Sequence, residues 1–266
     1  MKHLRKYIRS ILLESSMKPV AGLKSEGLAI WHMFSSNIRQ NRHYILLYNI
    51  EDLINNTTYV TSKIMDNIRK RENLDFYLEK EFKNLMIDSS IAAIIINPPN
   101  WPCNGANVVE VAVGWKGYGP TIYDLAMSIS PNGLIADRRE VSKKAQGIWK
   151  HYFENPRPEI EIKLLDSHDQ QWTPEKEDDC LPSINSKSGY GMYARAVPKE
   201  RWEKDPMNYS YNTDYALGHF EELVNIHKER TKKELPQLEK YFSKESYHRE
   251  VIWDFFEYVK TKRRDL

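Results

Sequence analysis

Apolar residues recur in short runs along the chain, and these runs predict strands that alternate with helices. The run Ile91–Ile96 is rich in β-branched residues and stops at Asn97-Pro98-Pro99-Asn100, which is typical of a buried strand followed by a loop. Similar runs predict further strands over residues 28–34, 43–48, 107–113, 134–136 and 160–165.

Apolar residues at helical spacing fill much of the remaining chain. This spacing predicts one helix between Thr121 and the stop signal Pro131-Asn132-Gly133, and others over residues 59–86, 142–153, 214–230, 234–242 and 246–263. The expected fold class is α/β with a mixed α+β sheet, in which helices flank a central sheet and a mainly helical extension follows.

Three segments are expected along the chain. Residues 1–15 hold a basic amphipathic helix, residues 16–158 form the main domain, and residues 159–266 form the C-terminal extension, an aromatic-rich loop region and then helices. The N-terminal helix suits docking on the domain, binding at a membrane surface or serving as an addressing peptide, and these alternatives stay open.

Composition narrows the functional classes. A net charge of +2 over 266 residues argues against general nucleic-acid binding, and no apolar run is long enough to span a membrane. The two cysteines, Cys103 and Cys180, are too few for a disulfide framework, which favours a reducing, cytoplasmic location. No metal site is expected: the histidines lack ligand spacing, and the acidic run Glu177–Asp179 suits a solvated loop better than a cation site.

The stretch Gly114-Trp115-Lys116-Gly117-Tyr118-Gly119-Pro120 is the strongest chemical signal. It lies between a predicted strand and a predicted helix, where backbone N–H groups and the positive end of the helix dipole converge on an anion. Its glycines allow close approach of a ligand, and Lys116 can offset phosphate charge. The turn is also consistent with an ordinary tight strand–helix connection.

This turn resembles motif A of the GNAT acetyltransferase superfamily, Q/R-x-x-G-x-G/A, with Gly114 at the position of the Gln or Arg. Ser142-Lys143-Lys144-Ala145-Gln146-Gly147-Ile148-Trp149 resembles that family's downstream N-x-x-A-x-x-L-Y, with Trp149 in place of the Tyr. The resemblance covers residues 91–153. It implies a GNAT-like sheet that binds acetyl-CoA and transfers its acetyl group to an amine of a protein or a small molecule.

The resemblance also implies roles for particular residues. The amides of Val111 and Val113 would polarise the acyl carbonyl, and Glu110 would be the general base unless it faces solvent at an edge. Tyr152 would replace the missing Tyr as proton donor to the thiolate, unless it is a packed aromatic. The pyrophosphate would be bound by Lys116, Gly117, Tyr118, Gly119, Pro120 and Thr121.

A second resemblance, to uncharacterised GNAT-like proteins of tailed bacteriophages, rests on residues 116–124, Asp137-Arg138 and Val141-Ser142. It implies a phage-encoded protein in the host cytoplasm. The alternative is a catalytically inactive protein that is packaged in the virion or binds a phage capsid or host protein, since Leu12-Leu13-Glu14 resembles a head-protease cleavage site. Asp137 and Arg138 would bind substrate or form a surface ion pair.

Overall fold

The computed structural model describes residues 27–37, 40–56, 83–99, 102–115, 117–167, 173–180, 200, 203–213, 217–234, 252–258 and 261. The predicted N-terminal helix, the helix expected over 234–242, most of the one expected over 59–86 and the residue Lys116 lie outside this part of the chain.

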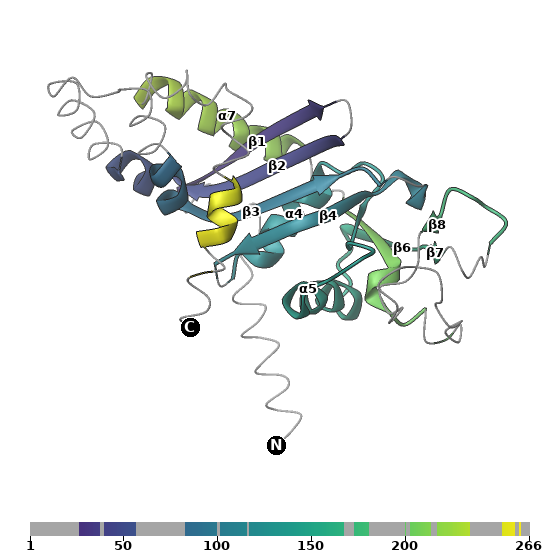
Figure 1. Cartoon of the computed structure of the whole chain (residues 1–266). Coiled ribbons are helices and arrows are strands. Elements are labelled where there is room, and N and C mark those ends of the chain that lie inside the picture. The colour runs from purple at the N-terminus through teal and green to yellow at the C-terminus, as the bar shows by residue number, and fades with distance from the viewer. Residues whose placement is uncertain are drawn as a thin grey trace, which may run out of the picture.

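A seven-stranded mixed sheet forms the centre of the molecule (Figure 1), which confirms the predicted fold class. Neighbouring strands are antiparallel except for one parallel pair, β4 and β5. The strands, in their order across the sheet, are β1 (Leu28–Asn37), β2 (Gln40–Asn49), β3 (Ser90–Asn97), β4 (Asn107–Gly114), β5 (Leu134–Ile135), β9 (Tyr209–Thr213) and β6 (Ile160–Leu164).

The sheet extends across the predicted boundary between residues 158 and 159. Strand β9 pairs with β5 through Leu134 and Tyr211, and β6 then pairs along the other edge of β9. Ile160 and Tyr211 are buried in the same apolar cluster as β1–β4, so part of the expected extension completes the main domain. Small elements lie nearby: the 3-10 helices η2 (Cys103–Gly105) and η3 (Pro206–Asn208), and the parallel pair β7 (Asp166–Ser167) and β8 (Asp179–Cys180).

Each face of the sheet buries its own apolar cluster, because successive strand residues point to opposite faces. One cluster joins Ile30, Ile45 and Ile94 to helices α4 (Gly119–Ser128), α5 (Lys143–Glu154) and α7 (Leu217–Glu234). The other joins Ala29, Leu46 and Ile95 to helical residues at 50–56, 83–89 and 252–258. Figure 1 views the sheet from the side of helix 252–258, drawn in yellow. No helix in the described ranges is long and apolar enough to cross a membrane.

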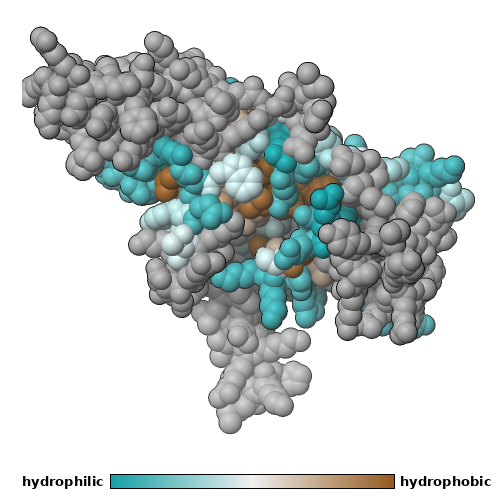
Figure 2. Space-filling model, in the orientation of Figure 1, coloured by the Kyte–Doolittle hydropathy of each residue, from teal (hydrophilic) through white to brown (hydrophobic). Residues whose placement is uncertain are grey.

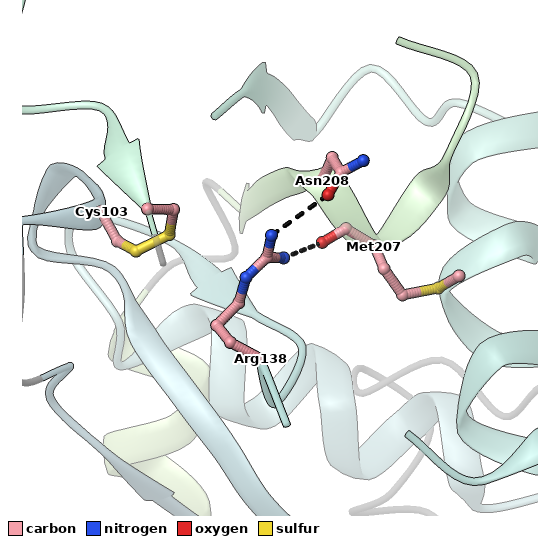
Figure 3. The surroundings of a disulfide bond; sticks show 5 residues. Cys103, Arg138, Met207 and Asn208 are labelled. Carbon is pink, nitrogen blue, oxygen red and sulfur yellow. Dashed lines mark hydrogen bonds between the residues drawn. A yellow bond between two sulfur atoms is a disulfide. The ribbon is translucent and has the colours of Figure 1, made fainter. Parts of the chain in front are cut away.

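Cys103 and Cys180 form a disulfide, which does not fit the reducing location expected from the number of cysteines. The bridge connects η2, just before β4, to β8 (Figure 3). Both cysteines are buried beside Ile135 and Leu165. Sequence spacing could not reveal the pair because 77 positions separate the two residues, and only the folding of residues 103–180 brings them together.

We expect Cys180→Ala to lower the free energy of unfolding by about 2–5 kcal/mol, because the bridge constrains a long loop in the unfolded chain. The measurement is urea unfolding of oxidised wild type, reduced wild type and the variant. Reduced wild type and the variant should have similar midpoints. Equal stability of the oxidised wild type and the variant would show that the bridge contributes nothing.

Candidate functional site

Strands β4 and β5 diverge soon after they begin. Their parallel pairing consists of Asn107 with Leu134 and Val108 with Ile135. Beyond Val108, β4 has a strand partner only on its β3 side among the residues described. The other edge from Glu110 to Val113, about 10 Å of extended backbone, can therefore pair with an extended ligand.

A β-bulge at Glu110 determines which amides face this edge. The register with β3 shifts between Ile95, opposite Val111, and Ile96, opposite Val109, so Glu110 is the extra residue. The amide of Trp115 donates to Ile91 O at 2.8 Å, and amides alternate sides along a strand. The amides of Val111 and Val113 therefore face β3, and that of Ala112 faces the open edge. The amides of Val111 and Val113, which were expected to contact an acyl carbonyl, are thus turned away from the open edge.

The glycine turn connects this edge to the start of α4. Gly117 has a φ of 92°, in the region that favours glycine, and Tyr118 N–H closes the turn onto Trp115 O at 3.1 Å. Tyr118 occupies the N-cap position without a side-chain cap, and Pro120 lies in the first turn of α4. The helix therefore begins with its positive end at the turn, as an anion site requires.

The predicted turn residues differ in accessibility. Gly117, Tyr118, Gly119 and Pro120 are half-buried, which leaves part of the turn open to a ligand. Thr121 is only 1% exposed, so its hydroxyl is covered by the protein. The expectation that Thr121 offers this hydroxyl to a ligand therefore conflicts with its burial.

Glu110 lies where β4 and β5 part, and it is half-buried rather than exposed at a solvated edge. Its Oε1 accepts a hydrogen bond from Arg42 Nη2 of β2 at 2.8 Å. Burial raises the pKa of the Glu110 carboxyl, the Arg42 guanidinium lowers it, and the Asp137 carboxylate raises it again. Its Oε2 is buried and has no hydrogen-bond partner in the described structure. This carboxylate has one acceptor atom committed to Arg42 and one still available.

Tyr152 lies in a buried network between α4 and α5. Its hydroxyl lies 2.7 Å from Asp124 Oδ1 and 3.0 Å from Pro120 O, and Arg157 Nη2 donates to the same Oδ1 at 2.8 Å. Burial is the main cause that raises the pKa values of both Tyr152 and Asp124. With its hydroxyl engaged and its ring only 2% exposed, Tyr152 matches the packed-aromatic alternative better than the proton-donor role.

Arg138 also has a structural place. Its buried guanidinium donates to Met207 O and to Asn208 Oδ1 (Figure 3), and burial lowers its pKa to about 10 against the opposing effect of Asp205 and Asp137. It therefore ties the loop after β5 to η3, which is neither the substrate role nor the surface position expected for it.

Two aspartates of the acidic run lie close to Asp166, which comes from β7. Asp166, Asp178 and Asp179 could together hold a metal ion, and Thr173 Oγ1 donates to Asp166 and lies within hydrogen-bond distance of Asp178. The sequence run contains two of the three carboxylates, but Asp166 lies upstream and joins them only through the pairing of β7 with β8.

Sequence reasoning missed Arg42, Asp124 and Ala112. Arg42 is 68 positions from Glu110, and nothing in its sequence context distinguishes it from other surface cations. An aspartate inside an otherwise apolar helical run, as at Asp124, was a signal, because a buried carboxylate requires partners. The role of Ala112 depends on a bulge that the apolar pattern does not reveal.

A scan against protein-family models found no match to this chain, and searches of curated proteins and of solved structures found none either.

We expect Tyr152→Phe to lower the free energy of unfolding by about 1–3 kcal/mol, because it removes a donor from the buried Asp124 carboxylate and keeps the ring. Tyr258→Phe is the matched control, since the hydroxyl of Tyr258 has no hydrogen-bond partner within the described residues. Denaturant unfolding of both variants provides the measurement. Unchanged stability of Tyr152→Phe would exclude the structural role.

Proposed function

We propose that this protein is a GNAT-like acetyltransferase that moves an acetyl group from acetyl-CoA to a primary amine. The observation that carries the proposal is the open edge of β4, which leads directly into the glycine turn at the start of α4. An acyl-CoA has an extended amide-containing arm and a pyrophosphate, and these two parts match an unpaired strand edge and a helix N-terminus.

Two groups of residues would bind the two parts of acetyl-CoA. The edge from Glu110 to Val113 offers backbone groups to the arm, and the amide of Ala112 is the one placed to donate to a carbonyl oxygen there. Gly117 and Gly119 let the pyrophosphate approach the turn closely. Lys116 adds a positive charge to this part of the chain.

Glu110 supplies the acid–base chemistry in this proposal. An amine reacts as a neutral nucleophile, so a carboxylate must first remove a proton from the ammonium form. The amine nitrogen then bonds to the acetyl carbon, the carbon–sulfur bond breaks, and the thiolate takes up the proton that the nitrogen loses. Glu110 suits the first step because burial raises its pKa toward the operating range of a base, while Arg42 keeps the carboxylate oriented.

The face of the sheet viewed in Figures 1 and 2 is where the acceptor would approach. Figure 2 shows apolar side chains exposed in the middle of this face, with polar side chains around them. Val111 and Val113 of β4 are half-buried and pack with the apolar cluster of this face. A carboxylate beside apolar strand residues suits an amine that carries an apolar stem, such as a lysine side chain.

We expect acetyl-CoA at about one hundred times its Kd to raise the melting temperature by about 5 °C. S-acetylpantetheine, which lacks the pyrophosphate, should cause a much smaller shift at the same concentration. Lys116→Gln should weaken acetyl-CoA binding by about tenfold, and Lys150→Gln, on the exposed surface of α5, is the matched control. No shift with acetyl-CoA at millimolar concentration would contradict the proposal.

Arg42→Gln should raise the pKa of the Glu110 carboxyl, because the neighbouring cation that favours the charged form is lost. A ¹³C NMR titration, with Glu110→Gln to assign the signal, measures this shift directly. In an acetyl-transfer assay the acid limb of the pH–rate profile should move to higher pH by the same amount, and Glu110→Gln should lower kcat by about a hundredfold. If the pKa measured by NMR shifts but the acid limb of the pH–rate profile does not, Glu110 is not the general base.

A further inference from the structure

A pocket lies at the opposite end of α4 from the glycine turn. Its volume is about 420 Å³, and it is lined by residues of β1, α7 and Ile129 at the C-terminal end of α4. The ten residues of α4, about 15 Å of helix, separate it from the turn. It therefore does not depend on the function proposed above.

One wall of the pocket changes from apolar to cationic along α7. Phe220, Val224 and Lys228 all line the pocket and are spaced four residues apart, so they form one stripe on the helix. Phe220 is buried, Val224 is half-buried and Lys228 is exposed. Ile129 adds a further apolar side chain. The pocket thus offers an apolar interior with an ammonium group at its rim.

A pair of histidines lies on the strand side of the pocket. His32 of β1 lines it, and His32 Nε2 lies 3.0 Å from Nδ1 of His43 on β2, with the two rings parallel to within 6°. Phe220 packs edge-on against His32, with 5.2 Å between ring centroids. One ring nitrogen of His32 is used by His43, so Nδ1 is the atom that a ligand in the pocket can contact.

The surroundings of His32 favour its neutral form. Burial, the neighbouring His43 and the Lys228 ammonium together lower the pKa of His32 to about 4, and burial is the largest of these causes. Burial also lowers the pKa of His43. Among the described residues, Glu221 is the other ionisable residue that lines the pocket, and it lies seven positions, about 10 Å, before Lys228 on α7. The α4 side contributes only the uncharged Ile129.

We propose that this pocket binds a small carboxylic acid with an apolar body, in its anionic form. The carboxylate accepts hydrogen bonds from Lys228 and His32, and the apolar body packs against Phe220, Val224 and Ile129. An anion beside His32 also favours the protonated imidazole, so binding takes up a proton through the histidine pair.

The test is isothermal titration calorimetry of the full chain with 3-phenylpropionate and with its uncharged analogue, 3-phenylpropionamide. We expect saturable binding of the carboxylate, tighter at about pH 5.5 than at about pH 7.5, with proton uptake visible in buffers of different ionisation enthalpy. The amide should bind at least about fivefold more weakly. Absence of saturable carboxylate binding at millimolar concentration, or equal affinity for the amide, would overturn the proposal.

Substitutions of two exposed residues of α7 should change the affinity for the carboxylate in opposite directions. Lys228→Gln should weaken carboxylate binding by about fivefold, and Glu221→Gln should tighten it by about twofold, since one removes attraction and the other repulsion. His32→Gln should remove the proton uptake, and Lys150→Gln on α5 should change nothing. Unfolding cannot produce opposite signs, so equal effects of Lys228→Gln and Glu221→Gln would refute the electrostatic assignment.

Discussion

The Asp124 side chain of α4 is buried, so its carboxylate requires hydrogen-bond donors or a cation from the surrounding fold. An unpaired carboxylate in such a place would cost several kcal/mol. Tyr152 of α5 and Arg157 after α5 both bond to its Oδ1, so the carboxylate draws α5 and the following loop onto α4. Every residue of α4 from Thr121 to Met127 is buried, which leaves the helix little freedom to shift. The glycine turn and the pocket near Ile129, which lie at its two ends, therefore both depend on this placement.

The separation of β4 from β5 follows from the same helix. Because α4 connects these two parallel strands and contacts β2, β3, β4 and β9, its packing determines where the chain returns to the sheet. Strand β5 is only two residues long, so the ladder ends at Val108 and the edge beyond it stays open. The bulge at Glu110 falls just beyond this point and turns the amide of Ala112 toward the opening. A short strand and one extra residue thus create the candidate site.

Much of the fold could be predicted because local pattern decides it. The β-branched run Ile91–Ile96 is a buried strand, the helix predicted over 142–153 is α5, and Ser142 caps that helix by accepting from Ala145 N–H. Features that depend on distant residues could not be predicted in this way. The Cys103–Cys180 bridge, the Arg42–Glu110 pair and the completion of the sheet by β9 each join residues far apart in the chain. The amide directions in β4 depend on a single inserted residue, which leaves no mark on apolar periodicity.

The two departures from the acetyltransferase motif have packing explanations. A Cβ on Gly114 would lie 3.3 Å from Ala92 Cβ, so any side chain there would push Ala92 aside by a few tenths of an ångström, and the glycine avoids this crowding. Trp149 is 1% exposed and packs between Tyr123 and Tyr211, with ring centroids 5.2 and 4.9 Å away, respectively. A tyrosine hydroxyl at that position would need a polar partner inside an aromatic cluster. Both residues therefore fit the packing around α4, and neither departure by itself argues against the function proposed for the open edge of β4.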